Sequence, residues 1–158
     1  MEKFSKNEEK KNILFVISSI GGGGAERVAC RLVNEFSKKH KVYLMYFDIK
    51  EKEYPVDQKV TKIPFIADNN KIDNKTKKKI NQKTQRMNEI EKIRIQNKID
   101  ITISFLFWPN IYNVDSEGGT KKILSERSDP DGKGEDYFKN MISAYEKADI
   151  IVFQTELI

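Results

Sequence analysis

The stretch from Ile13 to Val28 constrains the fold of this chain more than any other. It opens with five consecutive apolar residues, Ile13–Ile17, which are too few to cross a membrane and include three β-branched side chains. Such a run is typical of a strand that is buried on both faces of a parallel sheet. Four glycines follow at Gly21–Gly24, and an amphipathic segment begins directly after them. The stretch therefore predicts a strand, a glycine loop and a helix.

The glycine loop is longer than a tight turn needs, since a turn usually requires only about one or two glycines. Without Cβ atoms the loop can adopt positive φ angles, and a ligand can approach its backbone closely. The first N–H groups of the following helix lack intrahelical partners and carry the positive end of the helix dipole. A purely structural turn is the alternative. We expect an anion site, with phosphate as the typical ligand, formed by Gly21, Gly22, Gly23, Gly24, Ala25 and Glu26.

The spacing of these glycines matches neither of two common nucleotide-binding motifs. In a G-x-G-x-x-G pattern the third glycine would fall on Glu26 or Arg27, so the dinucleotide fingerprint is absent. A Walker loop requires Gly-Lys-Ser/Thr, whereas Gly24 is followed by Ala25 and Glu26. Asp48 ends the next apolar run, roughly where a dinucleotide fold places its ribose-binding acid. Because the fingerprint is absent, a capping or turn role for Asp48 is favoured over ribose binding.

The rest of the chain continues the alternation of apolar runs and periodic segments. Apolar residues at the helical 3–4 spacing predict one helix over residues 25–39, and another helix is expected over 135–147. Further strands are predicted at 42–47, 60–64, 100–104, 121–125 and 149–153. This order predicts a doubly wound, mostly parallel Rossmann-like α/β sheet with helices on both faces. We expect one domain at 12–158, preceded by a polar arm at 1–11.

Composition limits the class of protein. The chain has 158 residues, of which 38% are hydrophobic and 34% are charged, which suits a single domain with its own core. No run approaches the roughly 18 apolar residues of a transmembrane helix, and the polar start lacks the apolar segment of a signal peptide. We therefore expect a cytoplasmic protein.

Cys30 and His40 are the only residues of their types. Cys30 can form no internal disulfide, and its place on the first predicted helix favours a small buried hydrophobe over a nucleophile. His40 precedes the second predicted strand, which puts it at the wrong end of the sheet for catalysis. No Cys/His spacing suggests zinc, so we expect no metal site.

The segment 71–98 differs from the rest, because it holds ten Lys and Arg residues against three acidic ones. A thin apolar stripe through Ile80, Met87, Ile90 and Ile93 predicts a long helix with a cationic face. A solvated helix is one interpretation. Nucleic acid is disfavoured, because no aromatic residues lie between these charges. The other interpretation is docking to anionic lipid, through Lys77, Lys78, Lys79, Lys83 and Arg86.

Three stretches resemble the amino-terminal, acceptor-side domain of family 4 retaining glycosyltransferases, which have the two-domain B-type fold. The first is Ile17–Val28, around the glycines. The second is Ser125–Pro130, which is similar to a Ser-Glu-Arg-Asn-Asp-Pro run of one branch of the family, with Ser128 in place of the asparagine. The third is Ala148–Thr155, which resembles the last strand of the same domain.

The resemblance implies transfer of a sugar from a nucleotide-sugar donor to a polysaccharide or lipid-linked acceptor, without a cofactor or metal. The glycine loop would face the donor phosphates or the acceptor. The acceptor side would be lined by Phe107, Trp108 and Asn110 of the predicted aromatic loop at 105–110, where Pro109 suits a helix's first turn. Glu126 and Arg127 would orient polar groups, with an exposed loop ion pair as the alternative.

In that family a second domain, carrying a pair of glutamates, holds most of the nucleotide-sugar. The chain ends at Ile158, before such a domain would begin, so we expect it to be inactive alone. The expected location is the cytoplasm, at the inner face of the membrane. Two alternatives stay open: a nucleotide-binding oxidoreductase domain, and a non-catalytic binding or adaptor module.

Overall fold

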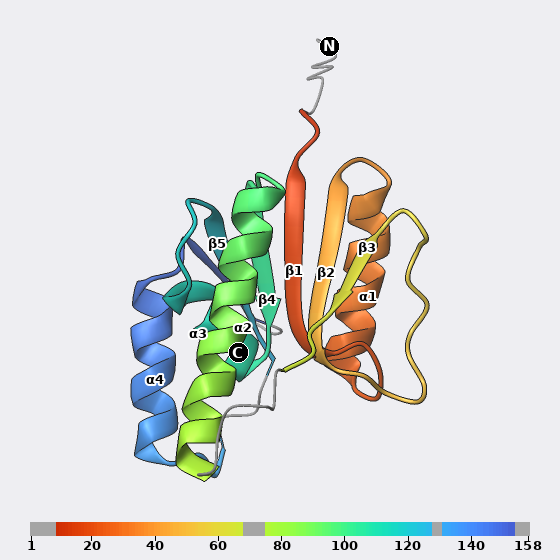
Figure 1. Ribbon diagram of the computed structural model, residues 1–158. Helices are drawn as coiled ribbons and strands as arrows, with labels where there is room; N and C mark the ends of the chain where they lie inside the picture. The colour runs from red at the N-terminus through yellow and green to blue at the C-terminus, as the bar shows by residue number, and fades with distance from the viewer. Residues whose placement is uncertain (1–8, 68–74, 128–130, 154–158) are drawn as a thin grey trace, which may run out of the picture.

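The computed structural model describes residues 9–67, 75–127 and 131–153, with the backbone alone described at 75–81. These residues form one α/β domain around a six-stranded sheet (Figure 1). In chain order the elements are β1 (Asn12–Ser19), α1 (Gly24–Ser37), β2 (Lys41–Asp48), β3 (Thr61–Pro64), α2 (Lys75–Gln96), β4 (Ile101–Phe105), α3 (Phe107–Asp115), β5 (Lys121–Glu126), α4 (Glu135–Glu146) and β6 (Ile150–Phe153). All six predicted strands are present, and the predicted fold class is confirmed.

The strands lie in the order β3-β2-β1-β4-β5-β6, and every neighbouring pair is parallel. The chain builds outward from β1 in one direction and then, from β4 onward, in the other. The boundary between β1 and β4 is therefore the topological switch point of the sheet. Ligands of such sheets bind beside this point, at the carboxyl ends of the strands. In Figure 1 that carboxyl edge faces downward.

Helices cover both faces of the sheet, as expected (Figure 1). Alternate residues of β1 point to opposite faces, so Phe15 packs with α1 residues such as Val33, while Val16 packs with Ile90 of α2. Helix α3 shares this second face with α2, and α4 packs beside α3 against β5. All of Leu14–Ile17 are fully buried. Burial on both sides explains why this strand reads as an unbroken apolar run.

A buried arginine joins α2 to α3 and β4. Arg94 is only 2% exposed. Its Nε donates to Thr102 Oγ1 at 3.2 Å, and its terminal nitrogens donate to the carbonyl oxygens of Asn113, Ser116 and Glu117 at 2.8–3.0 Å. A further bond joins Nη2 to Asn113 Oδ1 at 2.6 Å. Burial lowers the pKa of the guanidinium to about 10.

Polar side chains add hydrogen bonds to the apolar contacts that hold the inner side of α3. Ser104 Oγ of β4 donates to Asn110 Oδ1 at 2.7 Å and accepts from Asn113 Nδ2 at 2.9 Å. Asn110 Nδ2 reaches the carbonyl oxygen of Ser125 on β5 at 3.3 Å. The region predicted as an aromatic loop at 105–110 is therefore the end of β4 followed by the first residues of α3.

Candidate functional site

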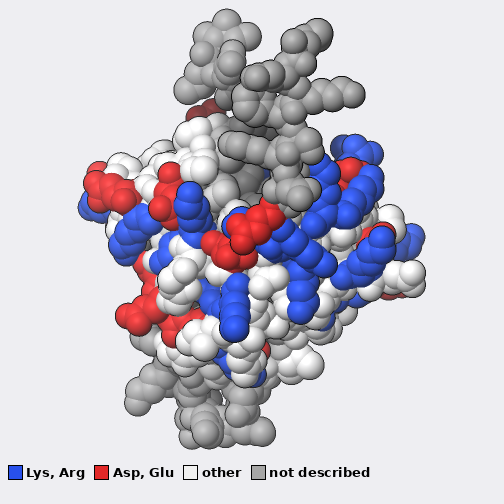
Figure 2. All heavy atoms as spheres, turned by 90° about the horizontal axis from the view of Figure 1, so that it is seen from above, with Lys and Arg blue, Asp and Glu red and all other residues white. Residues whose placement is uncertain are grey.

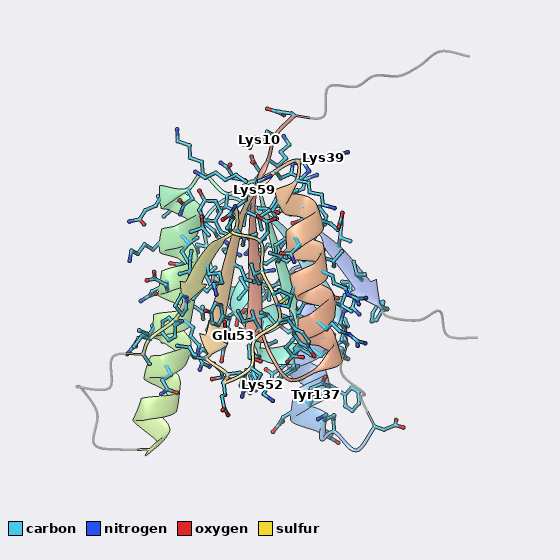
Figure 3. All side chains as sticks on the ribbon, turned by 90° about the vertical axis from the view of Figure 1, so that its right-hand side faces the viewer. Lys10, Lys39, Lys52, Glu53, Lys59 and Tyr137 are labelled. Atoms are coloured by element: carbon cyan, nitrogen blue, oxygen red, sulfur yellow. The ribbon has the colours of Figure 1, made fainter. Side chains whose placement is uncertain are left out.

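Two of the four glycines at the end of β1 have structural reasons within the domain. Gly22 adopts a φ of +104°, where side chains other than glycine are strained. A Cβ on Gly21 would overlap the backbone carbonyl of Lys52 and lie 3.3 Å from the Cα of Glu53. The connection between β2 and β3 thus passes directly over the glycine loop, where the N–H of Tyr54 donates to the carbonyl oxygen of Ile20 at 2.8 Å. Figure 3 places Lys52 and Glu53 at the carboxyl edge.

The other two glycines have no such reason. Gly23 has a φ of −107°, and a Cβ there would meet only the end of the flexible Glu26 side chain. Among the described residues, a Cβ on Gly24 would meet nothing within 4 Å. Helix α1 begins at Gly24, and no side chain caps it. In this part of the structure the Glu26 side chain is therefore the group that borders the first turn of α1, beside the switch point, where an anion site is expected.

Glu26 modifies the charge of this corner. Its carboxylate folds back toward Gly23, at the positive end of the α1 dipole. A phosphate would have to share the corner with this carboxylate or displace it, whereas a sugar hydroxyl could donate to it. Ala25 and Glu26 are both half-buried in the first turn of the helix, where their backbone N–H groups were expected.

A strained residue starts α3 on the other side of the switch point. Leu106 has a φ of +73° and a ψ of 162°, a combination that glycine alone adopts readily. Its N–H donates to the carbonyl oxygen of Ser125 at 3.2 Å, which helps to hold this conformation. Backbone strain of this kind costs about 1–3 kcal/mol and is concentrated at functional sites. It directs the first residues of α3 along the carboxyl edge.

The predicted aromatic residues are placed differently from the predicted asparagine. Trp108 is 55% exposed, and Phe107 is half-buried beside it, with ring centroids 5.0 Å apart. Asn110 is only 2% exposed and forms the interior bonds described above. The hydrogen bonds to Ser104 of β4 and to the Ser125 carbonyl oxygen of β5 hold its side chain against the sheet. The structure therefore corrects the expectation that Asn110 lines the acceptor side, and assigns it the support of α3.

Phe107 and Trp108 form one wall of a pocket of about 440 Å³ at the carboxyl edge. Tyr137 of α4 continues this wall, because its ring stacks directly on Phe107 with a centroid distance of 4.2 Å. Sequence reasoning missed the α4 side of this pocket. The signal was the aromatic pair Tyr137–Phe138 at the start of a helix that follows a carboxyl-edge loop. The pocket is lined by Phe107, Trp108, Lys133, Asp136, Tyr137 and Asn140.

Glu126 and Arg127 are not an exposed ion pair. Glu126 is 8% exposed, and it accepts from the Arg127 backbone N–H at 2.9 Å and from the Tyr145 hydroxyl at 3.2 Å. Burial, followed by the nearby carboxylate, raises the pKa of Tyr145. The Arg127 side chain turns the other way, with Nε donating to Ser125 Oγ at 3.0 Å and the guanidinium over the Phe105 ring. The side chains of Glu126 and Arg127 therefore lie on different faces of the sheet.

The basic helix α2 presents less charge outward than its sequence suggests. Lys83 donates to Asp115 of α3 at 3.1 Å. The Arg86 guanidinium lies over the rings of Phe47 and Tyr112, at 4.7 and 5.6 Å from their centroids. The Arg86 guanidinium thus faces the domain, whereas the Lys83 side chain is 42% exposed beside Asp115, so an outward place for Lys83 stays a prediction. The side chains of Lys77, Lys78 and Lys79 lie outside what the structure describes.

Basic side chains also gather elsewhere in space. Figure 2 shows many Lys and Arg side chains, mixed with acidic ones, at the amino edge of the sheet. Lys10, Lys39 and Lys59 lie there, opposite Tyr137 (Figure 3). Counting charges along the sequence assigned the excess of basic residues to 71–98. Such a count cannot detect the basic side chains at the amino edge, because they come from separate segments of the chain.

The remaining candidate residues have structural environments. Cys30 is 2% exposed, as predicted, and burial raises its thiol pKa to about 11. Among the described residues, no three His, Cys, Asp or Glu side chains are grouped as metal ligands would be. In the same part of the chain, no helix is both long and apolar enough to cross a bilayer.

Comparisons with known proteins relate this chain to glycosyl transfer. It is 30% identical over 120 residues to the Campylobacter jejuni protein named GalNAc-alpha-(1->4)-GalNAc-alpha-(1->3)-diNAcBac-PP-undecaprenol alpha-1,4-N-acetyl-D-galactosaminyltransferase. That match covers 73% of this chain but 32% of the relative, so the chain spans about a third of its length. No protein-family model matches the chain.

Among solved structures, sucrose-phosphate synthase from Thermosynechococcus elongatus has a similar fold, with a TM-score of 0.65 and 8% sequence identity. The match covers 90% of this chain and 42% of that one. The structural match supports the fold, while the sequence match shows that this chain is akin to a glycosyltransferase.

Proposed function

We propose that this chain is the acceptor-side half of a family 4 retaining glycosyltransferase with the two-domain B-type fold. The observation that carries the proposal is the glycine corner at the switch point. Among the described residues, neither a backbone contact nor a positive φ requires glycine at Gly23 or Gly24. An aromatic pocket lies along the same edge. An anion site beside a largely apolar pocket suits a reaction that transfers a sugar to a glycan hydroxyl and releases the nucleoside diphosphate that carried it.

The acceptor that we propose is a glycan on a lipid diphosphate, with a polysaccharide as the broader class. Support comes from the name of the Campylobacter relative, which includes diNAcBac-PP-undecaprenol. The donor would be a nucleotide-sugar, held mainly by a second domain. The first-turn N–H groups of α1 would stabilise charge on the leaving phosphate, in the way that preorganised donors do in other transferases. Without the second domain we expect no transfer by residues 1–158.

A lipid-linked acceptor would bring the protein to the inner face of the membrane, and we propose α2 as the contact. We take Lys77, Lys78 and Lys79 as the candidates, because Lys83 pairs with Asp115 and the Arg86 guanidinium lies over the Phe47 ring. Binding to anionic vesicles at low salt should fade as ionic strength rises, since salt screens exposed charges. Conversion of these three lysines to Gln should abolish binding, and equal binding to neutral vesicles would contradict the proposal.

The glycine corner offers a test with a matched control. Gly24→Val adds a side chain to open space, so it should leave the melting temperature nearly unchanged while it blocks the corner. Gly21→Ala pushes against the Lys52 backbone, so it should lower the melting temperature instead. The measurements are thermal unfolding, titration of backbone amide NMR signals with inorganic pyrophosphate, and sugar transfer by the chain joined to a donor domain.

We expect pyrophosphate to shift the amide signals of Ala25 and Glu26 in the wild type, and Gly24→Val to abolish both that shift and transfer. Unchanged binding and transfer in a folded Gly24→Val protein would make the corner a structural turn. DNA that continues in frame beyond codon 158 into a domain with paired glutamates would support the two-domain proposal.

A dinucleotide-dependent oxidoreductase is the second candidate, because its fold has the same strand order. Asp48 also lies at the end of β2, in register with Ser19 of β1. The glycine spacing argues against this function. Saturable binding of NAD, weakened by Asp48→Asn, would favour it over glycosyl transfer.

A further inference from the structure

We propose that the pocket between α3 and α4 is a binding site for one uncharged pyranose ring of the acceptor glycan. This inference rests on the proposed function, which it deepens by naming what the pocket recognises. The site is lined by Phe107, Trp108, Lys133, Asp136, Tyr137 and Asn140, and its volume of about 440 Å³ lies within the range of small-molecule sites.

The aromatic walls supply flat apolar surfaces at fixed angles. Phe107 and Tyr137 stack with 22° between their planes, and Trp108 meets Phe107 edge to face at 71°. Trp108 also stacks on Tyr112, which lies beneath it in the core, with a centroid distance of 6.2 Å. The rings are thus held in place before any ligand arrives. The C–H faces of a pyranose are apolar, and they can pack on such rings while the hydroxyl groups point to the rim.

The rim of the pocket carries groups that match those hydroxyls. Asp136 provides a carboxylate acceptor, and Lys133 provides an ammonium donor whose Nζ lies 5.6 Å from the Tyr137 ring centroid. The Asn140 amide nitrogen is used by the Asp136 carbonyl oxygen at 2.7 Å, which leaves the amide oxygen to accept from a ligand. The carboxylate of Asp136 and the amide oxygen of Asn140 can accept hydrogen bonds, and the ammonium group of Lys133 can donate one. These groups suit the hydroxyl and acetamido groups of a sugar.

Charge distinguishes this pocket from the glycine corner. The first turn of α4 contains Glu135 and Asp136, so two carboxylates offset the positive end of its helix dipole. A phosphate entering here would meet Asp136 on the rim. The first turn of α1 contains one carboxylate, Glu26. The start of α4 therefore carries one acidic side chain more than the start of α1, which favours an uncharged ligand in the pocket between α3 and α4.

Trp108 is the only tryptophan in the chain, so its fluorescence reports on this pocket directly. The full chain is titrated with methyl α-N-acetylgalactosaminide, with the α-1,4-linked disaccharide of the same sugar, and with inorganic pyrophosphate. We expect both sugars to change the emission saturably, the disaccharide at lower concentration, and pyrophosphate to leave it unchanged.

Variants test the two parts of the site. Asp136→Asn should weaken sugar binding about tenfold or more, because a hydrogen bond to a charged group is lost. Tyr137→Ala should abolish binding, because one wall is removed. Ile142→Ala is the matched control: it truncates a 54% exposed side chain of α4 outside the pocket, and it should leave the affinity unchanged. Circular dichroism verifies that each variant is folded, and sugar-observed NMR provides a second readout of binding.

Absence of a saturable change with both sugars, in emission and in NMR, would overturn the proposal. Equal weakening by Ile142→Ala and Asp136→Asn would overturn it too, and saturable pyrophosphate binding at Trp108 would make the pocket a phosphate site. The proposed function has its own readout at the amides of Ala25 and Glu26. If pyrophosphate does not shift the amide signals at the glycine corner but sugars still bind in the pocket, the chain is a sugar-binding module without transfer activity. If pyrophosphate binds at the glycine corner but no sugar binds in the pocket, the proposed transferase binds its acceptor at another site.

Discussion

Replacement of Arg94 by methionine should destabilise the domain severely. Arg94 lies beneath α3 and donates five hydrogen bonds to residues of β4, of α3 and of the turn after α3. Methionine has a stem of comparable length but no donor. Two oxygens of the fully buried Asn113, its backbone carbonyl oxygen and Oδ1, would then lose Arg94 as their partner, whereas the Glu117 carbonyl belongs to an exposed residue. The Ser116 carbonyl would keep Lys122 Nζ, which donates to it at 2.7 Å.

The size of the loss follows from these contacts. Each buried acceptor left without a partner costs about 1–3 kcal/mol. The two buried oxygens of Asn113 give about 2–6 kcal/mol. The burial that lowers the pKa of Arg94 to about 10 also penalises the charge, and methionine relieves that penalty. We therefore expect the free energy of unfolding to fall by about 2–4 kcal/mol, which is a large share of the roughly 5–15 kcal/mol of a typical domain.

Urea unfolding followed by circular dichroism measures this difference. Arg31→Met on the exposed side of α1 is the matched control, because Arg31 makes no hydrogen bond or ion pair among the described residues. It should change stability by less than about 0.5 kcal/mol. Arg94→Lys keeps the charge but cannot reach all five acceptors, so it should fall between the two. An Arg94→Met protein as stable as the wild type would refute the reasoning, since the network would then add nothing beyond its burial penalty.

Three further substitutions probe other features. Burial alone would raise the pKa of Asp115, but hydrogen bonds from Lys147 and Lys83 hold this pKa below its ordinary value. Asp115 therefore stabilises the fold at pH values above its unfolded pKa. This contribution is lost as the pH falls through the pKa of the folded state. Asp115→Asn should therefore reduce the loss of stability between neutral pH and acid, and an unchanged acid profile would contradict this. Gly21→Ala should cost about 1–3 kcal/mol in urea unfolding, and a neutral effect would show that the β2–β3 connection can move aside. Leu106→Gly should be about 1 kcal/mol more stable than Leu106→Ala, because only glycine relaxes at that φ; equal stabilities would mean that the backbone there is not strained.

The sheet could be predicted because its signal is apolar and continuous. Val42–Phe47 are all buried, as Leu14–Ile17 are, so each strand reads as an unbroken run. The helix over 135–147 was found from its position between strands, and α4 occupies Glu135–Glu146. Only the start of α3 was indicated, by Pro109, and its length was not predicted, because the inner residues Asn110 and Asn113 break the apolar 3–4 pattern.

The site was harder to predict than the fold, because its residues come from separate elements. The glycine loop could be located from the sequence, but only the structure distinguishes Gly21, which accommodates a neighbouring backbone, from Gly24, which faces open space. Arg86 was expected to face outward because charges usually do, yet aromatic rings of β2 and α3 surround its guanidinium. Tyr137 contacts Phe107 from thirty positions further along the chain, and no spacing rule predicts such a contact.

Helix α3 is anchored by hydrogen bonds, and this fixes its register in a way that apolar packing does not. Side chains in an apolar seam can repack when a helix slides or rotates by a small amount. The bonds of Asn110 to β4 and β5, and those of Arg94 to the C-terminal turn, are satisfied at one axial position only. The outer residues Phe107 and Trp108 are carried by a helix with this fixed register. Substitutions on that outer face can therefore change which ligand the edge accepts while the orientation of the helix is preserved.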